Sequence, residues 1–148
     1  MWSTVLGACT LFGAATLTAW CMNVALSEWL ARPEHRPLPR QGEWQAMCRC
    51  AQHRMVVPAL LSVVAALAVS TYLDDDRWQV GAALMIGAIC YTWDAIVPAG
   101  AVLRSIDPSR QGSVHLTRAR FRGFALQHYP LIGLGLSALV SFVWAYAG

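Results

Sequence analysis

The stretch GEWQAMCRCAQHRMVVPALLSVVAALAVSTYL, residues 42–73, decides the fold class of this chain. Its second half, residues 55–73, has nineteen residues and no formal charge. At ~1.5 Å of rise per residue, a helix of this length crosses most of a hydrocarbon core that is ~30 Å thick. The first half continues the same helix past the lipid and carries Trp44, His53 and Arg54. The stretch therefore predicts a transmembrane helix that continues into a polar segment at one end.

The rest of the chain is equally poor in charge. Of the 148 residues, 57% are apolar and only 13% are charged, which is too few ionic groups to coat a soluble globule of this size. Charged or Pro-containing connections separate four apolar segments, residues 2–30, 55–73, 78–103 and 123–147. We therefore predict an all-α, four-helix transmembrane bundle that forms a single domain over residues 1–148. Its helices should cover about residues 2–30, 43–73, 78–106 and 114–147, with an up-down topology because the connections are short.

The arginines set the expected orientation of the bundle. All eleven basic residues are Arg, and ten of them lie in or beside the connections after the first and third spans. The positive-inside rule places this Arg-rich side in the cytoplasm and both termini outside, in a plasma (inner) membrane. The helices then extend beyond the membrane on the cytoplasmic side. We expect residues 2–30 to be a retained helix, because they lack a basic leader and are about twice as long as the apolar core of a signal peptide.

Charge and cysteine usage restrict the expected partners. The net charge of +3 is concentrated on the Arg-rich side, which suits anionic lipid headgroups or an acidic ligand better than nucleic acid. Cys48 and Cys50 face the reducing side, so we expect no structural disulfide between them. The small residues of the first span suit close helix packing, within the bundle or in a homo-oligomer. Three further cysteines lie inside apolar spans, where cysteine usually acts as a small hydrophobe: Cys9, Cys21 and Cys90.

Polar residues from four different spans are expected at one height near the cytoplasmic interface: Asn23, His53, Asp94 and His128. Counting twenty-one residues back from Asp74 reaches His53, and counting twenty back from Gly148 reaches His128. In an up-down bundle the second and fourth helices lie diagonally across the core. The two imidazoles can therefore face each other.

Two further features add to this polar layer. Asp94 is the acidic residue placed well inside a span, where an ionisable group costs on the order of 2.5–3.5 kcal/mol, so we expect it to face the bundle interior and to have a partner. Phe121 and Phe124 share the helical face of His128, at i−7 and i−4. Together these residues predict an aromatic-lined pocket with two imidazoles. Taken singly, each polar residue also fits an ordinary hydrogen-bonded group at a membrane interface.

Residues 91–107, YTWDAIVPAGAVLRSID, resemble the third helix of the anthrone oxygenase family of small membrane proteins. The shared pattern is a Thr-aromatic pair, then Pro, then Leu: Thr92, Trp93, Pro98 and Leu103. The entry to the second helix, where Trp44 precedes the pair His53 and Arg54, is also similar, and the four-span layout matches over nearly the whole chain. The chain departs from the family at Gly100, where members often carry Asn.

The resemblance implies an oxygenase that acts on an anthrone-like, fused-ring phenolic substrate of aromatic polyketide biosynthesis, with molecular oxygen as co-substrate. A base removes a proton from the substrate, the anion reacts with oxygen, and loss of water leaves a quinone carbonyl. Imidazole suits the first step because its pKa lies near the working pH. His53 or His128 is the expected base, and Asp94 is expected to orient an imidazole or a substrate hydroxyl.

The same resemblance suggests the residues that bind the substrate. Arginines are expected to stabilise phenolate charge, and tryptophans to stack on the rings. The expected substrate-binding residues are Asn23, Trp44, Arg54, Trp93, Arg104, Arg120, Phe121 and Phe124.

Other classes of function stay open at this point. His53 and His128 can instead be axial ligands of a haem held in the bundle, which would be bound non-covalently because the chain has no Cys-x-x-Cys-His motif. A transition-metal site formed by Cys48, Cys50 and His53 is disfavoured, because Cys48 lies on a different helical face from the other two. The third class is a non-catalytic partner protein in the membrane or a minimal transporter. Few polar residues continue through the outer half of the spans, which favours a one-sided pocket over a transporter.

Overall fold

A computed structural model describes residues 2–30, 41–105 and 113–147, and within these ranges it gives only the backbone for residues 41–53, 104 and 113–117. All secondary structure in the described ranges is helical. The elements in chain order are α1 (Trp2–Leu30), α2 (Gln41–Leu73), α3 (Arg77–Tyr91), the π-helical turn η1 (Thr92–Ile96), α4 (Val97–Arg104), α5 (Ser113–Leu126) and α6 (Tyr129–Ala147).

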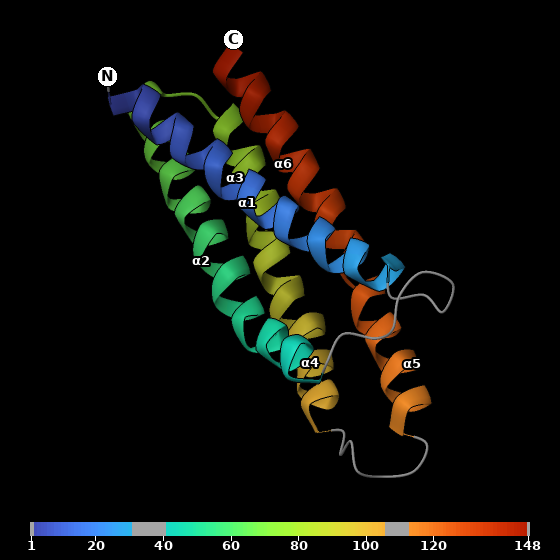
Figure 1. The fold of residues 1–148 in the computed structure, drawn as a ribbon. Coiled ribbons are helices and arrows are strands. Elements are labelled where there is room, and N and C mark those ends of the chain that lie inside the picture. The colour runs from blue at the N-terminus through green and yellow to red at the C-terminus, as the bar shows by residue number, and fades with distance from the viewer. Residues whose placement is uncertain (1, 31–40, 106–112, 148) are drawn as a thin grey trace.

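Among the residues that the structure describes with side chains, four helical stretches are long and apolar enough to cross a membrane: Trp2–Leu30, Arg54–Leu73, Arg77–Leu103 and Arg118–Ala147. The predicted all-α fold with four long apolar helices is confirmed, and the chain is an integral membrane protein. α1 packs against α2 and α6, and α3 packs against the same two helices, so the four form a closed ring around one core. Figure 1 shows both termini at one end of the bundle and α4 and α5 at the other.

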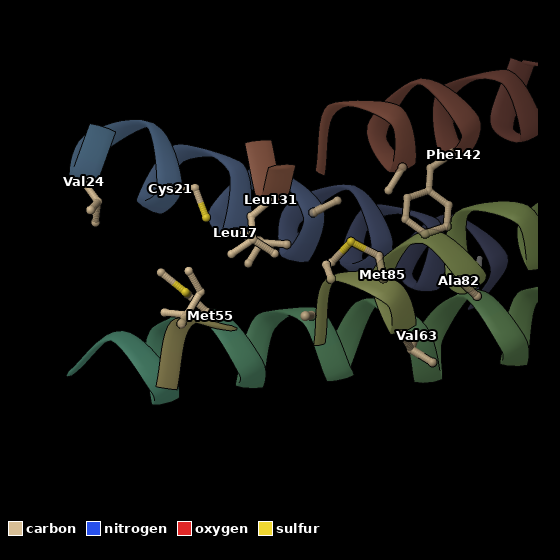
Figure 2. Close-up of a cluster of buried hydrophobic side chains, with 14 of the residues drawn as sticks. Leu17, Cys21, Val24, Met55, Val63, Ala82, Met85, Leu131 and Phe142 are labelled. Carbon is tan, nitrogen blue, oxygen red and sulfur yellow. The ribbon is translucent and has the colours of Figure 1, made fainter. Parts of the chain in front are cut away.

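The core consists of one buried stripe from each span. In α6 and the end of α5 the buried residues recur every three or four positions, which is the spacing that puts side chains on one helical face. Leu17 and Cys21 of α1, Met55 of α2, Met85 of α3 and Leu131 of α6 all lie in this core, and Figure 2 shows them pointing into the same space. The opposite faces carry many exposed large apolar side chains, as expected for surfaces that contact lipid.

The third span is interrupted one turn before Pro98. The Val97 N–H donates to the carbonyl of Thr92, five residues earlier, and the π-helical turn from Thr92 to Ile96 results. Pro98 has no N–H, and its ring pushes away the carbonyl four residues before it, so the chain widens to absorb the mismatch. The predicted continuous third helix is therefore α3, η1 and α4 in succession.

The outer connection between α2 and α3 is a tight turn. Asp74 ends α2 with a φ of 52°, and the N–H of Asp75 donates to the carbonyl of Ser70 at 3.2 Å. This is the Schellman arrangement that closes many helices. The Asp75 carboxylate accepts from the backbone N–H of Arg77 at 3.1 Å and from Arg77 Nε at 3.0 Å, at the first residue of α3. The Asp75 side chain therefore accepts from the first backbone N–H of α3 and also forms an ion pair with the Arg77 side chain.

Replacing Asp75 with Asn is expected to lower the thermal midpoint slightly at neutral pH and to change it little in strong acid. Hydrogen bonds from the Arg77 side chain, and then from its backbone N–H, hold the pKa of Asp75 below its usual range. A lowered pKa in the folded state gives stability that is present above the ordinary Asp pKa of ~3.9 and is lost as the pH falls through the lowered value. Thermal unfolding of both proteins in detergent, at neutral pH and at low pH, measures this. An equal difference at both pH values would contradict the assignment.

Candidate functional site

His128 lies in the turn between α5 and α6, where the fourth span is broken. α5 ends at Leu126, and Pro130 in the first turn of α6 has no N–H for the carbonyl of Leu126, so the helix cannot run straight through. The His128 N–H donates to the carbonyl of Ala125 at 3.0 Å, and the His128 carbonyl accepts from Ile132 at 3.0 Å. The side chain points inward and is fully buried, with 0% of its surface exposed.

The hydrogen bonding of His128 assigns its tautomer. Nδ1 lies 2.8 Å from the carbonyl oxygen of Phe124, and a carbonyl can only accept, so Nδ1 carries the proton. In the neutral imidazole, Nε2 therefore presents a lone pair. This nitrogen is buried, and none of the described residues hydrogen-bonds to it. Buried polar atoms in proteins almost always have a partner, so we look for the donor to Nε2 outside the described side chains.

Aromatic side chains surround this imidazole on one side. The Phe124 ring meets the His128 ring edge-on, with the ring centroids 4.7 Å apart. Phe121, one turn earlier, is buried as well. The structure thus brings three of the predicted site residues to one buried face, the face that the i−4 and i−7 spacing indicated. The Phe124 ring packs against the imidazole, so the surroundings of His128 on this face are aromatic and apolar.

A second group of predicted residues lines a separate cavity between α1 and α2. This cavity has a volume of about 490 Å³ and contains Asn23 and Arg54 in its wall. The Arg54 guanidinium lies over the Trp20 ring, 4.9 Å from its centroid. Trp20 Nε1 is buried and has no hydrogen-bond partner among the described residues. Trp20 was not among the predicted site residues, although its i−3 spacing from Asn23 puts both on one face of the helix.

The expectation that Asp94 faces the bundle interior is wrong. Asp94 is exposed on η1, and no described residue pairs with it. Thr92 and Ile96 are the buried residues of this turn, and Asp94 lies two positions from each, on the opposite side of the helix. The Trp93 side chain is 60% exposed for the same reason. Arg120 on α5 is also exposed, so none of these three predicted site residues lies inside the bundle.

Three predicted residues have side chains outside the described part of the structure: His53 and Trp44 on α2, and Arg104 at the end of α4. The pairing of His53 with His128 therefore stays a prediction. Among the side chains that the structure describes, no group of three His, Cys, Asp or Glu residues could hold a metal ion. The alternative metal site of Cys48, Cys50 and His53 also lies outside them.

Comparisons of this chain with protein-family models, with curated proteins and with solved structures give no match. The function of the chain must therefore be inferred from its own residues and geometry.

Proposed function

We propose that this protein is a membrane-embedded oxygenase that converts a fused-ring phenolic, anthrone-like substrate to a quinone with molecular oxygen. The supporting observation is His128 Nε2, a buried lone pair with a fixed tautomer and no donor among the described residues. A phenolic hydroxyl is the donor that such a nitrogen needs, and the fused rings suit the faces and edges of Phe121 and Phe124.

The proposed reaction begins with proton transfer to His128 Nε2. The electron pair of the broken bond stays on the substrate, and the resulting anion adds to oxygen at the ring carbon that was a methylene. The peroxide anion formed there takes the proton back from the imidazolium. The resulting hydroperoxide then loses one water molecule together with the remaining hydrogen of that carbon, which leaves one oxygen atom on carbon as the carbonyl and the other in water. The Phe124 carbonyl holds Nδ1–H throughout, and this bond strengthens when the ring becomes an imidazolium. His53 on α2 remains the proposed second imidazole, whereas Asp94, Trp93 and Arg120 take no part because they face outward.

The orientation that goes with this proposal has the Arg-rich end of the bundle in the cytoplasm and both termini outside, in the inner membrane. The arginine distribution supports it, since Arg118, Arg120 and Arg122 precede His128 on α5. The topology is then up-down, and His128 lies just inside the cytoplasmic interface. A cytoplasmic substrate would enter from that side.

The direct test is turnover of a hydroxylated anthrone by the purified full chain in detergent, under isotopically heavy oxygen gas. We expect quinone formation above the rate of heat-inactivated protein, with one heavy atom in the new carbonyl and one in water. A carbonyl oxygen that comes from solvent, under conditions where the product does not exchange, would contradict the proposed step. No turnover of any fused-ring phenol would remove the enzyme assignment.

A haem-binding bundle is the second candidate, and the His128 tautomer is the observation that favours it. Histidines that bind metals usually donate their other ring N–H to a carbonyl or carboxylate, as His128 does to Phe124. His128 and His53 would hold the haem. Haem bound there would supply one-electron and oxygen chemistry. An absorption spectrum of the purified protein separates the candidates, because a Soret band would favour haem, whereas protein with neither a Soret band nor turnover would favour a non-catalytic partner.

A further inference from the structure

Two cavities lie end to end along the groove between α1 and α2. The first is the polar cavity of Trp20, Asn23 and Arg54 described above. The second has a volume of about 580 Å³ and is lined almost wholly by apolar side chains, among them Val5, Phe12 and Ala65. Pro58 borders both cavities. They therefore meet beside Pro58.

Helical spacing shows that the two cavities form one groove. On α1 the lining residues recur every three or four positions from Val5 through Cys9, Phe12, Thr16 and Trp20 to Asn23. On α2 they recur in the same way from Arg54 through Pro58, Leu61 and Ala65 to Ala68. Each set is one continuous stripe on its helix, so the groove runs unbroken from a polar end to an apolar end.

The polar end has the chemistry of an anion site. Arg54 is held over Trp20, and no carboxylate among the described residues forms an ion pair with it. Trp20, in the same wall, has a buried Nε1–H donor that no described residue accepts from. Pro58 has no N–H to bond the carbonyl of Arg54, which leaves that oxygen able to accept a hydroxyl. This end of the groove therefore offers a cation and a donor for an oxyanion, and an acceptor for an alcohol.

The position and length of the groove match a lipid molecule. Arg54 directly precedes residues 55–73, which carry no formal charge, so it lies at the height where lipid headgroups begin. From Arg54 to Ala68 the groove extends ~21 Å at ~1.5 Å per residue. One leaflet of a ~30 Å hydrocarbon core is ~15 Å deep, so an extended acyl chain fits within that length.

We infer that the groove between α1 and α2 binds one anionic phospholipid, with its phosphate at Arg54 and Trp20 and an acyl chain along the apolar stripe. Charge complementarity selects the headgroup, and the apolar continuation selects a chain-bearing anion over free phosphate. This site is independent of the proposed catalysis at His128. It also gives Arg54 a role other than the predicted contact with a substrate phenolate.

Native mass spectrometry of the full chain in detergent tests the site with three probes: phosphatidylglycerol, phosphatidylcholine with the same chains, and glycerol phosphate. We expect phosphatidylglycerol to bind about fivefold more tightly than phosphatidylcholine, the order expected for one arginine at an anionic headgroup. Arg54→Gln should abolish this preference, and Trp20→Phe, which removes a donor to the phosphate that both lipids carry, should weaken the binding of both. Ala8→Trp, which places a large ring in the apolar stripe, should weaken both lipids. The matched control is Arg122→Gln, because Arg122 is equally exposed but lies on α5, outside the groove, and it should bind like the unmodified chain.

Several results would overturn the inference. Equal affinity for the two lipids, or an Arg54→Gln protein that keeps the preference, would show that the polar end does not select an anion. Glycerol phosphate that binds as tightly as phosphatidylglycerol, and equally well to Ala8→Trp, would show that the site takes a free anion. Circular dichroism of each variant verifies that the helices are intact. A loss of turnover in the His128 variants with unchanged lipid preference would separate this site from the catalytic proposal.

Discussion

Replacing His128 with Asn is expected to lower turnover of a fused-ring phenol by about a hundredfold to ten-thousandfold, the usual contribution of a positioned general base. The Asn side-chain amide can still donate to the Phe124 carbonyl in place of Nδ1–H, which is 2.8 Å from that oxygen. The change therefore removes the Nε2 lone pair while it keeps the local hydrogen bond. The measurement is the initial rate of oxygen uptake, with membranes or detergent-purified protein at matched concentration.

Two companion variants make the result interpretable. Leu131→Ala removes an equally buried side chain, with 0% exposed, one turn along the same helical face, and should lower stability by about 2–5 kcal/mol with little effect on turnover per folded molecule. His128→Gln breaks the bond to Phe124 and should lose both activity and stability. An Asn variant that turns over within twofold of the unmodified rate would rule out His128 as the base, and the assignment would pass to His53.

Height along the bundle can be counted from the sequence, whereas rotation about each helix axis needs a second comparison, that of helical faces. Counting residues at ~1.5 Å each placed Asn23, Asp94 and His128 near one layer. The buried stripes separate them: His128 continues the stripe that contains Phe121 and Leu131, but Asn23 and Asp94 are exposed. The i−4 and i−7 spacing places His128 and its phenylalanines on one helical face, whereas the depth of Asp94 says nothing about its face. The error at Asp94 is therefore one of helical face.

Other parts of the site depend on contacts that no single helix encodes. The burial of His128 Nε2, with no donor among the described residues, depends on the helix break at Pro130 and on the packing of neighbouring spans. The sequence pattern indicates only the break. The Arg54–Trp20 contact joins residues of two helices and requires their crossing geometry. Small residues predicted close approach of the first span to its neighbours, but the partner and the point of contact come from the structure. That point of contact is Gly13.

Replacing Gly13 with Ala is expected to lower the free energy of unfolding by about 1–3 kcal/mol through overpacking. A Cβ atom at this position would overlap the backbone carbonyl oxygen of Pro58 and the Ser62 hydroxyl, and a backbone atom cannot move aside as a flexible side chain can. The same displacement would strain the hydrogen bond from Ser62 Oγ to the Thr10 carbonyl, 2.7 Å long, which joins α1 to α2. Loss of that buried bond would add about 1–3 kcal/mol. Reversible unfolding in mixed detergent and denaturing micelles measures the change.

Gly87→Ala is the matched control, because a Cβ at Gly87 would have no neighbour within 4 Å among the described residues. Helix propensity alone should make that variant about 1 kcal/mol more stable, so the two identical substitutions are expected to differ in sign. If both variants instead shifted stability equally, α1 and α2 would be free to separate at Gly13. The groove between them could not then hold a lipid in one register, because Gly13 and Pro58, which meet at this crossing, both form its apolar wall. The difference in stability between the Gly13→Ala and Gly87→Ala variants therefore also tests whether the groove is rigid enough to select its ligand.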